Sequence, residues 1–180
     1  NRLDDSEASY QKAISINPNF ADAYNNLGIV LRELNRLDDS EASYQKAISI
    51  NPNFADAYSN LGFTLREMGR LNESETSYKK AISINPNFAE AYNNLGFTLR
   101  ELGKLEDSKN SFNKAIELKP DYPDAYNNLS LTFLMEGNFK KAYELSEWRW
   151  KTKLKIGNYL KSTKPNWNGE NNSSVFVWKE

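Results

Sequence analysis

The fold is decided by the stretch NPNFADAYSNLG at residues 51–62, because close copies of it recur along the chain. Its proline has counterparts spaced strictly 34 residues apart, and these are Pro18, Pro52, Pro86 and Pro120. A fixed period of this length is typical of a solenoid, in which one supersecondary unit is repeated and stacked. The stretch therefore predicts a repeat protein whose units are joined through this turn.

The same stretch predicts the end of one helix and the start of the next. Proline lacks an amide hydrogen and disfavours helical geometry in the residue before it, so a helix ending near Ile50 must stop at Asn51. The next helix is expected to start near Ala55, with Asp56 in its first turn, where free amides stabilise a carboxylate. Gly62 follows in mid-helix, where glycine costs about 1 kcal/mol relative to alanine. A facing helix pressed against Gly62 is the expected reason.

Sequence identity between the units indicates copies of one module. Residues 1–28 match residues 35–62 at every position but one. We therefore predict an array of helix pairs over residues 1–156, each with a helix A followed by a helix B. The predicted array comprises a half repeat at 1–20, complete repeats at 21–54, 55–88 and 89–122, and a divergent repeat at 123–156. Helix A should end at residues that accept left-handed backbone geometry, namely Asn35, Gly69, Gly103 and Gly137. Residues 157–180 are expected to be a linker or the start of a C-terminal domain that the chain does not contain.

Composition limits the classes of function. The 180 residues, 39% hydrophobic and 26% charged, are ordinary for a soluble protein. We expect no membrane association and a cytoplasmic location, because no apolar run of about 18 residues is present and nothing at Asn1 resembles a signal peptide. The chain has no cysteine and no histidine, so it lacks thiol chemistry and the commonest general base and metal ligand. We expect no catalytic site, no cofactor and no metal within these residues.

Charge is distributed unevenly along the chain. Residues 1–148 carry 16 basic and 22 acidic side chains, whereas residues 149–180 carry 7 and 2. Contact with nucleic-acid phosphates needs a basic stripe, so the repeats are not expected to bind nucleic acid. The basic tail is interpreted as a solvated helix end followed by a linker.

The pattern resembles the tetratricopeptide repeat (TPR) family over about residues 1–150. The family signature of aromatic, leucine-glycine, second aromatic with alanine, and proline is present here as Tyr24, Leu27-Gly28, Tyr44 with Ala47, and Pro52. The resemblance implies an all-α, right-handed superhelical solenoid of antiparallel helix pairs with a short irregular C-terminal extension. It also implies a protein-interaction module. The divergent unit has serine for glycine at Ser130 and serine for the aromatic at Ser146, which suggests a capping unit.

Candidate binding residues lie on helix A, which lines the concave face in the resembled family. One asparagine precedes the buried leucine of each unit, and its amide can both donate to and accept from the backbone of an extended ligand. These ladder residues are Asn26, Asn60, Asn94 and Asn128. Further candidates around them are Asn25, Asn93, Asn127, Phe63, Phe97, Arg32, Arg66 and Arg100. Two alternatives stay open: the asparagines satisfy polar groups inside the repeat, and the arginines, each followed by glutamate, are solvated surface charges.

The asparagine ladder also resembles the repeat region of the O-linked N-acetylglucosamine transferases, in which such a ladder holds acceptor polypeptides in extended form. The resemblance implies a polypeptide ligand and an acidic row at Asp22, Asp56 and Asp124, from which Glu90 departs. A clamp for a C-terminal carboxylate would need lysines on helix A. None occurs at 22–34, 56–68 or 90–102, so this mode of binding is not expected.

The C-terminal segment resembles the linker of bacterial proteins in which a TPR array leads into a glycosyltransferase-like domain. The residues that carry this resemblance are EWRW at 147–150, PNWNGE at 165–170 and VFVW at 175–178. The VFVW segment also predicts a buried strand. Three hypotheses follow. The chain is an extended-peptide-binding scaffold forming the N-terminal arm of a larger protein, or the substrate-presenting region of a bacterial glycosyltransferase whose catalytic domain is absent. The third is a spacer or a rod that self-associates through its truncated N-terminal end.

Overall fold

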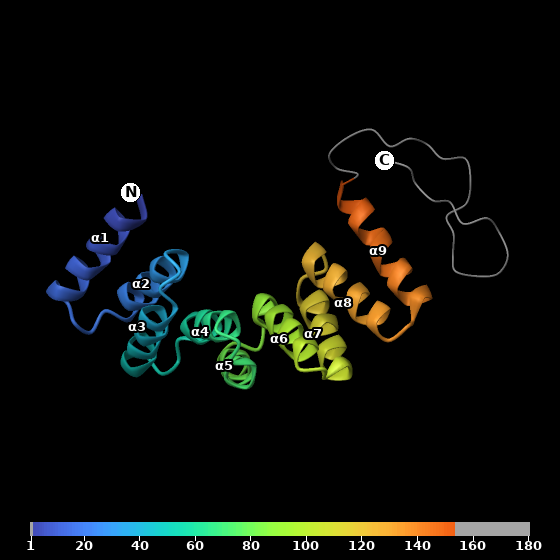
Figure 1. Cartoon of the computed structure of the whole chain (residues 1–180), viewed down its shortest axis with the longest axis horizontal. Helices are drawn as coiled ribbons and strands as arrows, with labels where there is room; N and C mark the ends of the chain where they lie inside the picture. The colour runs from blue at the N-terminus through green and yellow to red at the C-terminus, as the bar shows by residue number, and fades with distance from the viewer. Residues whose placement is uncertain (1, 154–180) are drawn as a thin grey trace. The chain divides into compact units, whose positions relative to one another are not determined.

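The computed structural model describes residues 2–153, with the side chains of residues 2–146. Within these residues the chain forms nine α-helices and no strand (Figure 1). Helices α2, α4, α6 and α8 are the A helices, and each pairs with the B helix that follows it. The bounds are α1 Arg2–Ile16, α2 Ala21–Glu33, α3 Leu37–Ile50, α4 Ala55–Glu67, α5 Leu71–Ile84, α6 Ala89–Glu101, α7 Leu105–Leu118, α8 Pro123–Met135 and α9 Phe139–Lys153. The predicted all-α solenoid of antiparallel helix pairs is confirmed.

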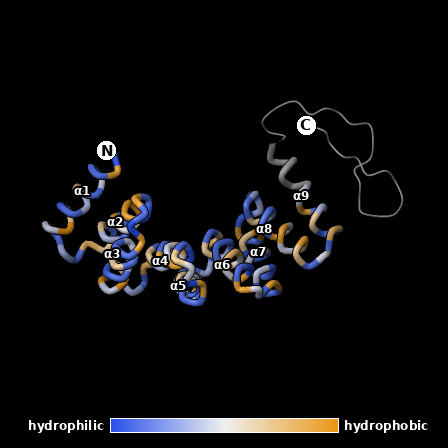
Figure 2. The backbone as a smooth tube through the Cα atoms, viewed as in Figure 1, coloured by the Kyte–Doolittle hydropathy of each residue, from blue (hydrophilic) through white to orange (hydrophobic). Residues whose placement is uncertain are grey.

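Backbone contacts divide the chain into two compact units, Asn1–Tyr122 and Pro123–Glu180. In the first unit each A helix packs against the B helices on both sides of it in sequence. Neighbouring A helices also touch, α2 with α4 and α4 with α6, whereas the backbones of neighbouring B helices do not. Hydrophobic and hydrophilic residues alternate along these helices (Figure 2). In the second unit α8 packs against α9.

The turns between helices follow the expected local rules. Left-handed backbone geometry occurs after each complete A helix, with φ of 58° at Asn35, 76° at Gly69, and 75° at both Gly103 and Gly137. This confirms the predicted ends of helix A. The turn at Asn51 works differently, since its backbone is extended and its side-chain Oδ1 accepts a hydrogen bond of 3.1 Å from the Asn53 amide.

The core of each complete repeat is an aromatic ring pressed against a glycine of the facing helix. Tyr44 is fully buried, and a Cβ atom added to Gly28 would lie 2.6 Å from its ring. The same contact joins Gly62 with Tyr78 and Gly96 with Phe112. The facing helix predicted at Gly62 is therefore present, and close packing is the reason for glycine in mid-helix.

Long side chains link the outer B helices of the first unit, whose backbones do not touch. Each link joins a glutamate to a cation 29 residues later, at the start of the next B helix. The pairs are Glu7 with Arg36 at 2.8 Å, Glu41 with Arg70 at 2.5 Å and Glu75 with Lys104 at 2.7 Å.

Some expectations fall on residues 154–180, which lie outside the described part of the chain. They are the linker or domain start at 157–180 and the strand at 175–178. Among the described residues, no helix has both the length and the apolar character needed to cross a membrane.

Candidate functional site

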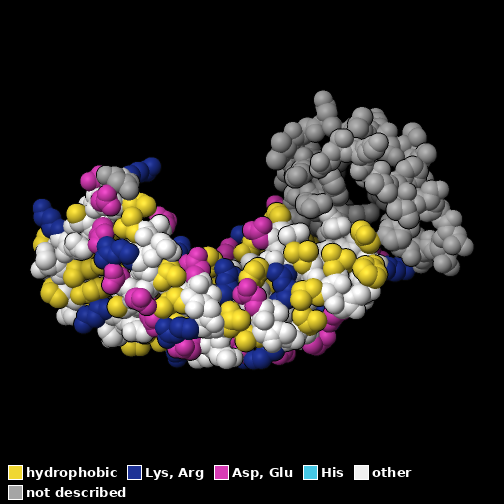
Figure 3. Space-filling model, viewed as in Figure 1, with side chains coloured by type: hydrophobic (Ala, Val, Ile, Leu, Met, Phe, Trp, Pro, Cys, Tyr) yellow, Lys and Arg dark blue, Asp and Glu magenta, His cyan; other side chains and the backbone are white. Residues whose placement is uncertain are grey.

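The solvent-facing surface of each A helix in the first unit repeats one column of side chains. The column has an acidic residue, the ladder asparagine, an apolar residue and a glutamate at spacings of four, three and four residues, which places them on one helix face. In α2 these are Asp22, Asn26, Ile29 and Glu33; in α4 they are Asp56, Asn60, Phe63 and Glu67; in α6 they are Glu90, Asn94, Phe97 and Glu101. We call these three columns together the A-helix face. Acidic and basic side chains lie interspersed over the side of the first unit that Figure 3 shows.

The ladder asparagines of the first unit lie at the seams between neighbouring A helices and are half-buried. Asn60 Nδ2 donates a hydrogen bond of 3.0 Å to Asn25 Oδ1, and Asn25 Nδ2 lies 3.4 Å from Asn26 Oδ1. A chain of amides thus joins α4 to α2. In α6, Asn93 Nδ2 lies 3.4 Å from Asn94 Oδ1. These asparagines therefore contact polar groups inside the repeats, which is one of the two alternatives that the sequence left open.

In the first unit, each ladder amide keeps one group without a partner among the described residues. These groups are the Nδ2 of Asn26, the Oδ1 of Asn60 and the Nδ2 of Asn94. The seam consequently uses only half of each amide. Peptide binding by these asparagines stays a prediction.

The other predicted asparagines are placed differently. Asn25 and Asn93 are 6% and 7% exposed, so they lie in the seam beneath the A-helix face. In the second unit Asn127 is exposed and Asn128 is half-buried. The asparagines named from the sequence therefore do not share one environment.

Arginines and phenylalanines form a continuous alternating stack in the first unit. The Arg32 guanidinium lies 4.6 Å from the centre of the Phe63 ring, and Arg66 lies 4.6 Å from the same ring. Arg66 and Arg100 lie 4.4 and 4.7 Å from the centre of the Phe97 ring. Such cation–π contacts favour planar guanidinium groups. The three arginines are thus held between helices, in contrast to the solvated charges that the sequence allowed.

The hydroxyls of two core tyrosines lie near this stack. Tyr78 Oη is buried and has no hydrogen-bond partner among the described residues, whereas Tyr44 Oη is buried near the hydroxyls of Ser40 and Thr64. Burial raises the pKa of both tyrosines. The charge of Arg32 and the hydroxyls of Ser40 and Thr64 act in the opposite direction on the pKa of Tyr44, as do the charges of Arg66 and Arg32 on that of Tyr78. Glu67 raises both pKa values further, so this glutamate also lies within electrostatic reach.

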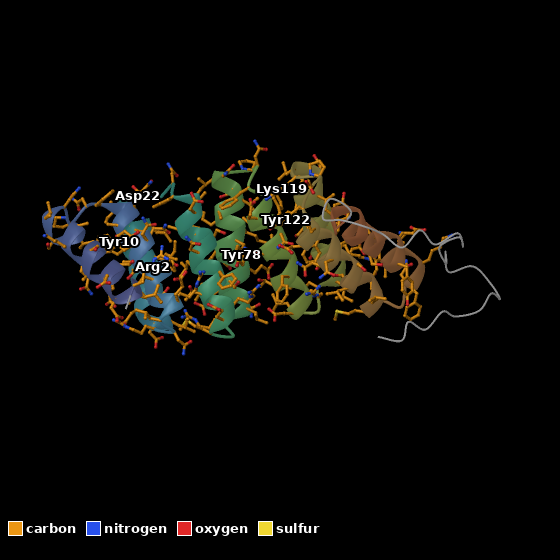
Figure 4. All side chains as sticks on the ribbon, turned by 90° about the horizontal axis from the view of Figure 1, so that it is seen from above. Arg2, Tyr10, Asp22, Tyr78, Lys119 and Tyr122 are labelled. Atoms are coloured by element: carbon orange, nitrogen blue, oxygen red, sulfur yellow. The ribbon has the colours of Figure 1, made fainter. Side chains whose placement is uncertain are left out.

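One rim of the A-helix face includes residues that the sequence reasoning did not select. Asp22 and Asp56 are exposed there, as the predicted acidic row requires. Glu90 accepts a hydrogen bond of 2.8 Å from Lys119 Nζ, and this bond lowers the pKa of Glu90. Lys119 Nζ also lies 4.6 Å from the centre of the Tyr122 ring, and both residues are labelled together with Asp22 in Figure 4.

The glutamates at the end of each A helix were also missed as members of the face. The sequence offers them only as members of arginine–glutamate pairs on the solvated surface, although adjacent helical side chains point in different directions. The signal that could have found them is their spacing of seven residues from the ladder asparagine. These glutamates are Glu33, Glu67 and Glu101.

Solved structures of other proteins have the same fold. A crystal structure of MamA has 25% sequence identity and a TM-score of 0.73, covering 83% of this chain and 91% of that one. A structure from a study titled functional characterization of Pseudomonas aeruginosa pilF has 20% identity and a TM-score of 0.71, with coverage of 82% and 76%. A thermophilic TPR protein of Thermus thermophilus has 19% identity and a TM-score of 0.71, with coverage of 86% and 84%.

Sequence models of one repeat family match most of the described chain. The model described as TPR repeat matches residues 1–34, 64–99 and 98–137, and two models described as tetratricopeptide repeat match 21–54 and 43–76. No curated protein matches the sequence. The fold is generally non-catalytic and serves protein–protein interaction or scaffolding. The chain belongs to the tetratricopeptide repeat family.

Proposed function

We propose that the A-helix face binds a partner polypeptide in extended conformation. The observation that carries this proposal is the triplicate column, in which three neighbouring helices present the same amide and the same set of apolar and charged groups. A ligand that contacts all three columns must itself have a repeating element. An extended polypeptide backbone is such an element, because it offers a carbonyl and an amide at every residue.

The unused halves of the ladder amides suit this ligand. Asn26 and Asn94 each retain donor hydrogens, and Asn60 retains an acceptor. Together they can accept and donate along a backbone whatever its side chains. Beside them, Phe63 and Phe97 are held by stacked arginines, so the apolar surface is ordered before the ligand arrives.

The experiment is a binding screen on an array of unstructured 12-residue peptides. Asn94→Ala removes a ladder amide whose Nδ2 has no partner among the described residues, so it should weaken the peptides that bind by about 0.5 to 1.5 kcal/mol. Asn110→Ala is the matched control, because Asn110 is exposed on α7 and away from the A-helix face. Equal affinities for the parent protein and the Asn94 variant, or no binding by any peptide, would contradict the proposal.

We also propose self-association through α1. No residue of α1 is buried, whereas the matching residues of α3 include the fully buried Tyr44 and Ala47. Ile16 at the end of α1 is 76% exposed. A second copy of the chain is the occupant we propose for this apolar face, because near-identical modules offer near-identical packing surfaces.

The proposal that this module is the arm of a larger protein rests on residues 147–178. Their resemblance to the linker of bacterial glycosyltransferases is the feature that favours it. Sequencing of the full gene product tests this proposal. A nucleotide-sugar-binding domain after Glu180 would support the hypothesis that the chain is the substrate-presenting region of a glycosyltransferase. A different domain there would contradict it.

A further inference from the structure

We propose that the partner is a basic polypeptide segment, rich in lysine or arginine, lying extended across α2, α4 and α6. The inference rests on the proposed function, because it names the ligand class of the same face. It follows from how this chain distributes its ion pairs.

On the B helices of the first unit, every glutamate has a basic partner within 2.8 Å. These are Glu7, Glu41, Glu73, Glu75, Glu106 and Glu117. On the A helices, Glu33, Glu67 and Glu101 are exposed and form no ion pair with any described residue. Among the described residues, the glutamates of the B helices thus have counter-charges and these three A-helix glutamates do not, although Asp5, Asp38 and Asp107 on the B helices are also exposed without an ion pair.

Arg32 and Arg66 form no ion pair with the glutamates that follow them, whereas the charge of Glu101 acts on the neighbouring Arg100. Arg32 and Arg66 stack on Phe63 and are half-buried in the seam. Adjacent side chains on a helix are turned about 100° from one another, so Arg66 points away from Glu67. The charge that a ligand meets at the end of each column is therefore the carboxylate.

A second row of carboxylates lies at the opposite end of the columns. Asp22 and Asp56 are exposed and form no ion pair within the described part of the chain, and Glu90 is held by Lys119. Eleven residues separate the two rows on each helix, which corresponds to about 16 Å at 1.5 Å per residue. The asparagine and apolar rows run between them.

This geometry fits an extended basic chain. A backbone lying midway between the two acidic rows is about 8 Å from either, which a lysine or arginine side chain can span. Successive side chains of an extended chain point to opposite sides, so they reach the two rows in turn. Complementary charges of this kind chiefly set partner choice and association rate.

The test uses three fluorescein-labelled 12-residue peptides with C-terminal amides. They share a serine and alanine background and carry four lysines, four glutamines or four glutamates. Fluorescence anisotropy should give the lysine peptide at least about fivefold higher affinity than the glutamine peptide, and no detectable binding of the glutamate peptide. The affinity of the lysine peptide should fall as salt rises from about 50 mM to about 300 mM.

Isosteric variants locate the binding. Glu67→Gln should weaken the lysine peptide about two- to fivefold, and the Glu33→Gln/Glu67→Gln double variant should weaken it further. Glu106→Gln is the matched control, because it removes the same charge from an ion-paired glutamate on α7. It should change affinity by less than about twofold. Far-UV circular dichroism melts of all variants verify the fold.

The outcomes separate this inference from the function on which it rests. Equal affinities for the lysine and glutamine peptides, or equal effects of the Glu67 and Glu106 variants, would contradict the inference that the ligand is basic. The proposal that the face binds a peptide would not be affected. Tighter binding of the glutamate peptide would overturn it likewise. Absence of binding by every peptide, here and on the array, would overturn both.

Discussion

Ser130 Oγ donates a hydrogen bond of 2.7 Å to the carbonyl oxygen of Ala142, from helix A to helix B. In the complete repeats the same bond runs the other way, from a serine of helix B to a glycine carbonyl of helix A. Those bonds, each 2.7 Å, join Ser40 to Gly28, Ser74 to Gly62 and Ser108 to Gly96. The divergent unit therefore has its serine at the facing position, on helix A instead of helix B, and keeps the hydrogen bond between its helices.

A second substitution accompanies this exchange. Ser130 stands where the other units have a glycine pressed on an aromatic ring, and the ring position is occupied by Ser146. A side chain at position 130 is tolerated because no ring occupies that facing position. The serines at positions 130 and 146, which identified the last unit as divergent, thus compensate for each other.

Alanine at the packed glycines should destabilise the first unit. Gly28→Ala would place a methyl group 2.6 Å from the Tyr44 ring, whereas Gly62→Ala would place one 3.1 Å from the Tyr78 ring. We expect Gly28→Ala to lower the free energy of unfolding by roughly 1 to 2 kcal/mol, since overpacking exceeds the gain in helix propensity. Gly62→Ala should cost less. Urea denaturation measures both, and a stabilised Gly28 variant would contradict the packing account.

Removal of an orphan hydroxyl should be harmless or favourable. Tyr78 Oη is buried without a partner among the described residues, and Phe112 occupies the equivalent position in the next repeat. We expect Tyr78→Phe to leave the free energy of unfolding unchanged or to raise it by up to about 1 kcal/mol. The reciprocal control, Phe112→Tyr, buries a new hydroxyl and should cost about 1 to 3 kcal/mol. A Tyr78→Phe protein clearly less stable than its parent would mean that the hydroxyl has a partner in solution.

The ionic links between B helices should make stability fall in acid. Burial alone raises the pKa of Glu75, but hydrogen bonds from Lys104 and Lys79 outweigh it and hold the pKa below its usual value of 4.5. A carboxyl with a lowered pKa in the folded state contributes stability above that usual value, and this stability is lost as pH falls through the lowered pKa. Thermal melts between pH 7 and about pH 3 should therefore show a smaller acid-induced loss for Glu75→Gln than for the parent. If the variant and the parent lose stability equally as pH falls, the ion pairs of Glu75 do not contribute to the acid sensitivity.

Self-association through α1 should depend on protein concentration. Sedimentation equilibrium should show a weight-average mass that rises with concentration, because burial of the apolar face of α1 favours the dimer. Ile16→Glu should reduce the association, whereas Met135→Glu, an exposed apolar residue of the second unit, should leave it unchanged. A strict monomer at all concentrations, or equal effects of both variants, would exclude this interface.

Local rules and the 34-residue period were enough to predict most of the fold. The ends of helix A at Asn35 and the later glycines, and the ring packed on Gly62, follow from requirements that act within one unit. The contacts across units were not predictable in this way. The bond from Asn60 to Asn25 and the stacking of Arg32 on Phe63 depend on how one A helix is offset against the next. Sequence periodicity does not contain that offset, so the sequence leaves the arginines open as binding residues or as solvated charges.

The most direct test of the central claim is an NMR titration that follows the side-chain amide signals of the asparagines. The titrant is the tightest-binding peptide of the array. If an extended polypeptide binds the A-helix face, the signals of Asn26, Asn60 and Asn94 should shift together and saturate with the measured affinity. The signals of Asn72 and Asn110, exposed on the outer helices, should stay in place. Saturation of binding with the three ladder signals unmoved, or with shifts at the outer asparagines instead, would contradict the account.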